Sequence, residues 1–195
     1  MTTVSIIVHS GFGHTAKVAK RVAVGAGSVE AVNVHLLSIT GDQIVDGRWQ
    51  DDAVMAQLTA SDAIIFGSPT YMGMVSGPFK CFADATAPFW FDQSWKDKLA
   101  GGFTCSGNPS GDKLSTLQYM VTLAGQLRML WIGTSESPSQ VTGDSRNIDQ
   151  WGFYLGVGAV GNMQDPETPN EGDLVTAELY GQRIAHAAVR WTRNG

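Results

Sequence analysis

The chain has 195 residues, of which 43% are hydrophobic and 16% are charged, and it contains 23 glycines. This length and composition predict one globular domain with a full core. The formal net charge of -5 offers no basic field to a phosphate backbone, so nucleic acid is not expected as a partner. No apolar run reaches the roughly 18 residues of a membrane span, and residues 2–8 lack the basic flank of a signal peptide. We therefore expect a cytoplasmic protein that acts on small molecules.

Short apolar runs alternate with segments of helical periodicity along the chain. Residues 3–9 form a β-branched apolar run that stops at a glycine-containing turn, which is typical of a buried parallel strand. The same criterion predicts further strands at 32–37, 62–67, 99–105 and 128–133. Apolar residues at helical spacing predict helices at 14–26, 51–60, 77–87, 112–125 and 172–191.

Five such strands joined by helices predict one parallel sheet, because each helical crossover returns the chain to the same end of the sheet. The fold class is therefore α/β, a doubly wound five-stranded parallel sheet with helices on both faces, in a single domain over residues 1–195. Residues 134–172 are rich in Gly, Ser, Asn and Pro and are too long for an ordinary loop. We expect a functional insertion at about 134–172.

Open parallel sheets bind ligands outside the carboxyl ends of their strands, where the strand order reverses. Loops of unusual composition follow three of the predicted strands, at 10–15, 68–77 and 106–111. The first joins a strand to a helix, so its backbone N–H groups and the helix dipole can receive a phosphate, with Ser10 and Thr15 adding hydroxyl donors. Taken alone, this loop is equally consistent with an ordinary tight turn.

The first loop also fits the dinucleotide fingerprint G-x-G-x-x-A through Gly11, Gly13 and Ala16. A dinucleotide-binding domain needs an acidic residue near the end of its second strand, where it binds a ribose hydroxyl. Residues 34–40 contain no acidic residue, and Asp42 comes late. The fingerprint also leaves the other two loops unexplained, so we favour a mononucleotide phosphate site.

Four motifs occur in a recognisable order. They are Ser-Gly-Phe-Gly-His-Thr at 10–15, Gly-Ser-Pro-Thr-Tyr-Met-Gly at 67–73 followed by Ser76-Gly77, the pair Phe89-Trp90, and Ser106-Gly107 after the fourth strand. Together they resemble the flavodoxin-like NAD(P)H:quinone oxidoreductases first described as tryptophan-repressor-binding proteins. The resemblance covers nearly the whole chain. It implies a flavodoxin-like fold that binds FMN, NAD(P)H as co-substrate, a quinone as acceptor, and a homotetramer.

The resemblance also implies which residues hold the cofactor. The FMN phosphate would lie on Ser10, Gly11, Phe12, Gly13, His14 and Thr15. The edge of the isoalloxazine ring would follow Pro69, Thr70, Tyr71, Met72 and Gly73, with backbone N–H groups directed at N5 and O4. The pyrimidine side would be closed by Cys105, Ser106, Gly107, Asn108, Pro109 and Ser110.

Two aromatic residues are implied as substrate contacts. Phe12 would contact the nicotinamide nucleotide, and Trp90 would cover the ring as a stacking lid for quinone or nicotinamide. The alternative for Trp90 is a place in the core or at a subunit interface, since it belongs to the cluster Phe89-Trp90-Phe91.

This sequence departs from the family pattern at three places. Tyr71-Met72-Gly73-Met74 stands where the family usually carries Arg-Phe-Gly-Asn, Gly125-Gln126 replaces a histidine pair, and Pro109 lies in a loop that is usually glycine-rich. The first departure removes a cation and an amide from the implied flavin edge. The departures therefore bear on which acceptor is used.

No catalytic side chain is expected. The sequence lacks a Ser/His/Asp set, its histidines have no partners at metal-ligand spacing, and Cys81 and Cys105 form no C-x-x-C pair and are expected to be buried reduced thiols. Such a protein suits a cofactor that carries the chemistry, here by ping-pong transfer of two electrons. Two alternatives stay open: a one-electron carrier of the flavodoxin type, and a non-enzymatic binding protein whose flavin site has decayed.

Overall fold

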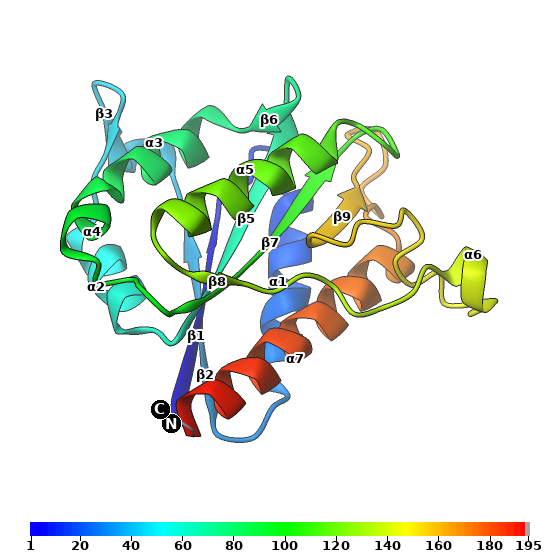
Figure 1. Cartoon of the computed structure of the whole chain (residues 1–195). Helices are drawn as coiled ribbons and strands as arrows, with labels where there is room; N and C mark the ends of the chain where they lie inside the picture. Colours follow the sequence, from blue (N-terminus) through cyan, green and yellow to red (C-terminus); the bar gives the residue numbers. More distant parts are fainter. Residues whose placement is uncertain (194–195) are drawn as a thin grey trace.

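The fold centres on a parallel sheet whose strands follow the order β2-β1-β5-β7-β8 (Figure 1). The computed structural model describes residues 1–193. The strands are β1 (Thr2–Val8), β2 (Val32–Ser38), β5 (Ala63–Tyr71), β7 (Leu99–Ser106) and β8 (Leu130–Trp131). The order reverses between β1 and β5, as in flavodoxin-like doubly wound sheets. The predicted fold class is confirmed.

The fifth strand position is filled by two separate segments. Strand β8 pairs with β7 at Leu99 and Ala100, and β9 (Val157–Val160) pairs with the other half of β7 at residues 103–106. The predicted strand at 128–133 is therefore shortened to two residues, and the chain leaves the sheet before returning as β9. Strand β9 lies within the segment 134–172 that we expected to be an insertion.

Glycine content explains why β9 was not predicted as a strand. Glycine weakens a strand unless another backbone or ring must approach closely. Both conditions hold here, because a Cβ at Gly156 would meet the carbonyl oxygen of Gly102, and a Cβ at Gly158 would meet the ring of Phe153. Close packing, invisible in the local sequence, makes this glycine-rich segment a strand.

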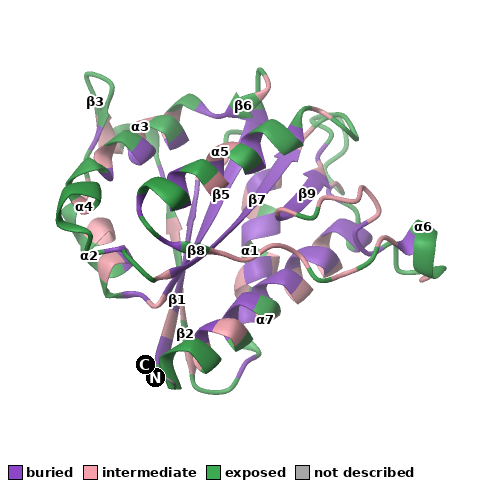
Figure 2. Cartoon of the chain, viewed as in Figure 1, coloured by how far each residue is buried: buried purple, intermediate pink, exposed green. Residues whose placement is uncertain are grey.

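Helices cover both faces of the sheet and bury a core on each. Helices α1 (His14–Gly27) and α7 (Glu171–Arg193) lie side by side on one face (Figure 1), where Val22 and Ile184 belong to one apolar cluster. The helices on the other face, which bury Phe79 and Met120 among others, are α2 (Asp52–Ala60), α3 (Gly77–Ala85) and α5 (Lys113–Gln126). Figure 2 shows the inner strands β1, β5 and β7 buried between these two layers, whereas the edge strand β2 is only partly buried.

The remaining elements are short. They are the 3-10 helix η1 (Gly41–Gln43), β3 (Ile44–Val45), β4 (Arg48–Trp49), β6 (Met74–Val75), α4 (Ala87–Asp92) and α6 (Ser139–Thr142). The predicted helix at 77–87 ends as α3 at Ala85, and a separate short helix, α4, begins at Ala87. Helix α6 projects from the body of the molecule (Figure 1). Across residues 1–193, no helix has the length and apolar character needed to cross a membrane.

Candidate functional site

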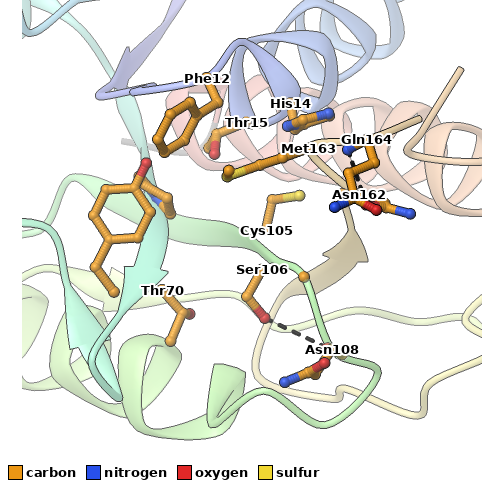
Figure 3. Close-up of a pocket in the computed structure, with 14 residues that line it drawn as sticks. Phe12, His14, Thr15, Thr70, Cys105, Ser106, Asn108, Asn162, Met163 and Gln164 are labelled. Carbon is orange, nitrogen blue, oxygen red and sulfur yellow. Dashed lines mark hydrogen bonds between the residues drawn. The ribbon is translucent and has the colours of Figure 1, made fainter. Parts of the chain in front are cut away.

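A cavity of about 440 Å³ opens at the carboxyl ends of the strands (Figure 3). Its walls are formed by the loops after β1 and β9, by the carboxyl end of β5, and by the end of β7 with the loop that follows it. Three of these wall segments fall within the loops predicted from composition, and they meet beside the reversal of strand order. Of the predicted site residues, those that line the cavity are Phe12, His14, Thr15, Pro69, Thr70, Tyr71, Cys105, Ser106, Gly107 and Asn108.

The first loop presents the start of α1 to the cavity. Gly13 precedes the helix with φ 90° and ψ -22°, a left-handed conformation that favours glycine. The hydroxyl of Ser10 accepts hydrogen bonds from the N–H groups of Gly13 and Ala16, each at 3.1 Å, and so closes the loop on itself.

Two backbone donors at this helix start have no partner among the residues that the structure describes. Within residues 1–193, the N–H groups of His14 and Thr15 donate no hydrogen bond, and the first turn of α1 carries no acidic residue. Free N–H groups and the positive end of the helix dipole together favour an anion. The start of α1 is therefore suited to a phosphate.

Two aromatic side chains border the cavity at its mouth. The Tyr71 hydroxyl packs on Gly11, where a Cβ would collide with it. The rings of Phe12 and Tyr71 meet edge to face, with centroids 6.3 Å apart and planes at 70°, and Phe12 remains 64% exposed. Partial burial raises the pKa of the Tyr71 hydroxyl above its ordinary value, so that hydroxyl is neutral at physiological pH. The pair offers flat apolar surface beside the phosphate-binding end.

Met72 and Gly73 form the tip of a hairpin between β5 and β6. Tyr71 pairs with Met74 across the hairpin, and both tip residues have positive φ, 49° and 79°. Two consecutive positive φ values are typical of a type I′ turn. Neither tip residue lines the cavity, and the Met72 side chain is fully exposed. Of the predicted segment 69–73, the structure brings only residues 69–71 to the cavity.

Three threonine hydroxyls form a buried network next to the cavity. Thr70 Oγ1 lies 2.8 Å from both Thr104 Oγ1 and Thr116 Oγ1, and so links β5, β7 and α5. Cys105, the next residue on β7, is buried. Burial raises the pKa of its thiol to about 12, so Cys105 presents a neutral thiol to the cavity.

The third loop turns tightly between β7 and α5. The Ser106 hydroxyl lies 3.5 Å from the carbonyl oxygens of Asn108 and Gly111, and Figure 3 shows the contact with Asn108. Pro109 and Ser110 belong to this loop but do not line the cavity. Their carbonyl oxygens instead accept hydrogen bonds from Lys113. The Pro109 oxygen accepts from Lys113 Nζ, and the Ser110 oxygen accepts from the Lys113 backbone N–H.

Sequence reasoning missed a fourth wall of the cavity. Gly161, Asn162, Met163 and Gln164 follow β9 and line it. A Cβ at Gly161 would lie 2.7 Å from the His14 side chain and 2.8 Å from Cys105 Sγ, so glycine allows this segment to approach the other two loops. Residues Val157–Val160 form the strand before this wall, but their glycine content hides the strand pattern in the local sequence.

Trp90 lies elsewhere. It is on α4 and lines a second cavity, of about 270 Å³, between α3, α4 and α5. The Arg128 guanidinium lies 5.7 Å from the centroid of its ring and donates to its carbonyl oxygen at 3.0 Å. Phe89, also on α4, stacks on the buried ring of Trp95 with the ring centroids 4.9 Å apart. This contact directs Phe89, rather than Trp90, into the core. Within one chain, Trp90 does not cover the cavity at the strand ends.

The residues around the first cavity fit an FMN molecule. The free N–H groups at the start of α1 suit its phosphate, and the flat rings of Phe12 and Tyr71 suit its planar ring system. The cavity volume lies in the range that small-molecule sites occupy.

Comparison with known proteins gives a consistent result. Residues 7–141 match the family model described as NADPH-dependent FMN reductase. The chain is 36% identical to Flavodoxin FldP from Pseudomonas aeruginosa, over 95% of this chain and 96% of that protein. It is 32% identical to an NAD(P)H dehydrogenase (quinone) from Geotalea uraniireducens, over 97% of this chain and 99% of that protein. The crystal structure of the flavodoxin, WrbA-like protein from Agrobacterium tumefaciens superposes on this chain with a TM-score of 0.74 at 40% sequence identity. The match covers 97% of this chain and 99% of that protein.

These likenesses extend over nearly the full chain and confirm the resemblance inferred from the four motifs. They also confirm FMN as the cofactor and NAD(P)H-dependent oxidoreductase chemistry as the class of activity. The chain belongs to the NADPH-dependent FMN reductase family.

Proposed function

We propose that this protein passes two electrons from NAD(P)H, through bound FMN, to a quinone or a similar small acceptor. The observation that carries the proposal is the cavity at the strand ends, which joins a free helix N-terminus to an aromatic mouth. Relatives named NAD(P)H dehydrogenase (quinone) support the acceptor class, at 32% and 30% identity over nearly the whole chain.

FMN, when bound, supplies the hydride chemistry. The protein's contribution is to hold, orient and shield it. In the proposal, the N–H groups of His14 and Thr15 bind the phosphate, and Thr70 and Tyr71 lie along the ring edge with the turn amides of residues 72–73 beyond them. Ser106, Gly107 and Asn108 close the pyrimidine side, with Asn162 and Gln164 opposite them. The neutral Cys105 thiol takes no part in electron transfer.

The ping-pong mechanism is proposed because donor and acceptor would enter the cavity through the same opening. Phe12 and Tyr71 border the opening, and in the proposal both the nicotinamide and the quinone enter beside them. The nicotinamide and the quinone cannot both occupy this one surface, so they must bind there one after the other. NAD(P)⁺ therefore leaves before the acceptor enters.

The kinetic pattern tests this proposal. Initial rates measured at several fixed quinone concentrations while NADPH is varied should give parallel double-reciprocal lines. High quinone should inhibit competitively against NADPH, because both occupy the same surface. Intersecting lines would mean that donor and acceptor bind together, and the shared mouth would then be wrong.

We also propose that the enzyme is a homo-oligomer, a tetramer by resemblance, and that it acts in the cytoplasm, where NAD(P)H is available and both cysteines stay reduced. Exposed apolar side chains support the oligomer: Phe91 is 77% exposed beside the partly exposed Trp90. Light scattering should give a multiple of 20.8 kDa, and a monomer mass at micromolar concentration would contradict the oligomer.

A second candidate is an electron carrier of the flavodoxin type. The relative named Flavodoxin FldP, at 36% identity over 95% of this chain, favours it. Such a carrier would use the same cavity but would receive its electrons from a protein rather than from NAD(P)H. The net charge of -5 is modest for a carrier that docks by a strongly acidic surface.

A further inference from the structure

Lys113 is a fully buried lysine at the first position of α5. Its Nζ donates to two main-chain carbonyls of the third loop, 2.5 Å from Asn108 O and 3.2 Å from Pro109 O. Across the described residues, it makes no ion pair with a carboxylate. Lysine is almost never fully buried without such a partner, because desolvating an ammonium is costly.

No carboxylate contacts the Lys113 ammonium directly, and the negative charge of Asp173 acts on it only from beyond salt-bridge distance. The titratable neighbours that face it are Cys105 on β7 and Asp173 on α7. Cys105 is neutral because burial raises the pKa of its thiol to about 12.

The carboxylate of Asp173 is held by hydrogen bonds from three neutral donors rather than by Lys113. Its Oδ1 accepts from Gln150 and Trp151, and its Oδ2 accepts from the N–H of Val160. Burial lowers the pKa of Lys113 to about 8, so the ammonium form prevails at neutral pH. A positive charge therefore lies behind the loop that closes the cavity.

The 106–111 loop directs main-chain carbonyl oxygens at the Lys113 ammonium. The carbonyls of Asn108 and Pro109 turn towards Lys113, and Gly111 at φ 52° leaves no room for a Cβ beside the Ser106 hydroxyl and Asn108 O. On the cavity side, the same loop presents Gly107 and Asn108. The position of Lys113 thus fixes how residues 106–111 meet a ligand.

We propose that Lys113 is a positioning residue which holds the 106–111 loop against the pyrimidine side of FMN and makes reduced, anionic FMN bind more tightly relative to oxidised FMN. This inference rests on the proposed function, because it assumes FMN in the first cavity. Two-electron reduction with uptake of one proton leaves one additional negative charge on the ring. A buried ammonium attracts that charge with little screening by solvent or salt.

The test compares the FMN dissociation constants of wild-type protein and of Lys113→Met, each with oxidised FMN and with dithionite-reduced FMN under nitrogen. In Lys113→Met, the preference for reduced over oxidised FMN should fall on the order of tenfold. A tenfold fall corresponds to a midpoint potential lower by about 30 mV for a two-electron couple. Lys113→Gln keeps a hydrogen-bond donor for the loop without the charge, so it should lose the same preference with a smaller loss of oxidised-FMN affinity.

Lys98 provides a matched control. It is a partly buried lysine whose Nζ also donates to two carbonyls, Thr59 O at 2.7 Å and Ser61 O at 2.6 Å. It precedes β7 at the end of the sheet away from the cavity. Lys98→Met should lower stability and leave the preference for reduced FMN unchanged.

Equal losses of affinity for both forms of FMN in the Lys113 variants would overturn the inference and leave Lys113 a structural residue. If neither Lys113 variant folds, wild-type protein supplies the test. Its preference for reduced FMN should weaken as pH rises through about 8, where the ammonium deprotonates, and a constant preference from about pH 7 to about pH 10 would contradict the inference. Wild-type protein that binds neither form of FMN would instead refute the proposed function.

Discussion

The hydroxyl of Tyr71 occupies the space in which any residue other than glycine at position 11 would carry its Cβ. The end of β5 is thereby packed against the loop after β1, and the two loops together form the aromatic mouth of the cavity. Tyr71 stands where the family usually carries arginine, so this contact belongs to the departure that we noted at the implied flavin edge.

Replacing Gly11 with alanine should displace Tyr71 and weaken FMN binding. If the contact is the reason, the same replacement made in a Tyr71→Ala background should have little effect, because the space is then empty. Contacting residues of this kind couple by about 0.5–3 kcal/mol. FMN titration of the two single variants and the double variant measures the coupling. Additive losses would mean that Tyr71 and Gly11 act independently.

Replacing Gly13 should impair FMN binding for a different reason. No atom lies within 4 Å of a Cβ built there, but φ is 90°, a conformation that costs a residue with a side chain on the order of 1–2 kcal/mol. Gly13→Val should therefore lose most bound flavin, because its side chain also blocks approach to the helix N-terminus.

Gly125 on α5 is a matched control for this glycine. It also has open space around its Cβ position but no positive φ. Gly125→Ala should stabilise the protein by about 0.4–1 kcal/mol and leave flavin content unchanged. Undiminished flavin in purified Gly13→Val would show that the phosphate lies elsewhere.

Trp90 should behave as a structural residue in the single chain. Replacing it with alanine removes its contacts with Arg128 and the second cavity, and because the ring is 41% exposed the cost should be about 1–2 kcal/mol, a few degrees in Tm. Rates with a quinone and with ferricyanide should fall alike or not at all. A loss confined to the quinone, with Tm unchanged, would show that Trp90 covers the cavity of another subunit.

Asp149 should make stability depend on pH in the weakly acidic range. Its Oδ1 accepts from the N–H of Phe153, whereas its buried Oδ2 has no partner within the described residues. Desolvation raises its pKa from 3.8 to about 6, aided by the charges of Glu136 and Asp173. The folded state therefore holds this proton more tightly than the unfolded state between those pH values.

The resulting contribution to stability is fully present below about pH 4 and is lost as pH rises through about 6. A shift of this size corresponds to an effect on the order of 3 kcal/mol. Urea unfolding of wild type and Asp149→Asn at several pH values measures it, since the variant lacks the titrating group. Parallel stability curves for the two proteins between pH 4 and 7 would rule out a raised pKa at Asp149.

Much of the fold could be predicted because its inner strands are continuous apolar runs. Residues 63–67 and 99–105 are buried on both faces of the sheet, so local composition alone marks them. Strand β9 could not be predicted in this way, because its glycines are explained only by the approach of Gly102 and Phe153, which are distant in sequence.

The candidate site was also predicted only in part, for the same reason. The rule that ligands lie at the carboxyl ends of parallel strands brought three loops together from sequence. The fourth wall, Asn162 to Gln164, depends on the pairing of β9 with β7. The place of Trp90 depends on the stacking of Phe89 on Trp95 and on the break between α3 and α4. These are long-range packing events, which local pattern does not report.

In the proposed reaction, FMN in this cavity accepts electrons from NAD(P)H and gives them to a quinone. The most direct test mixes FMN-loaded protein with one equivalent of NADPH or NADH under nitrogen and follows the oxidised-flavin absorbance. We predict that at least one nucleotide bleaches the flavin and that a quinone added afterwards restores the colour. Flavin that stays yellow with both nucleotides, yet is bleached by dithionite, would contradict the claim and identify the protein as an electron carrier.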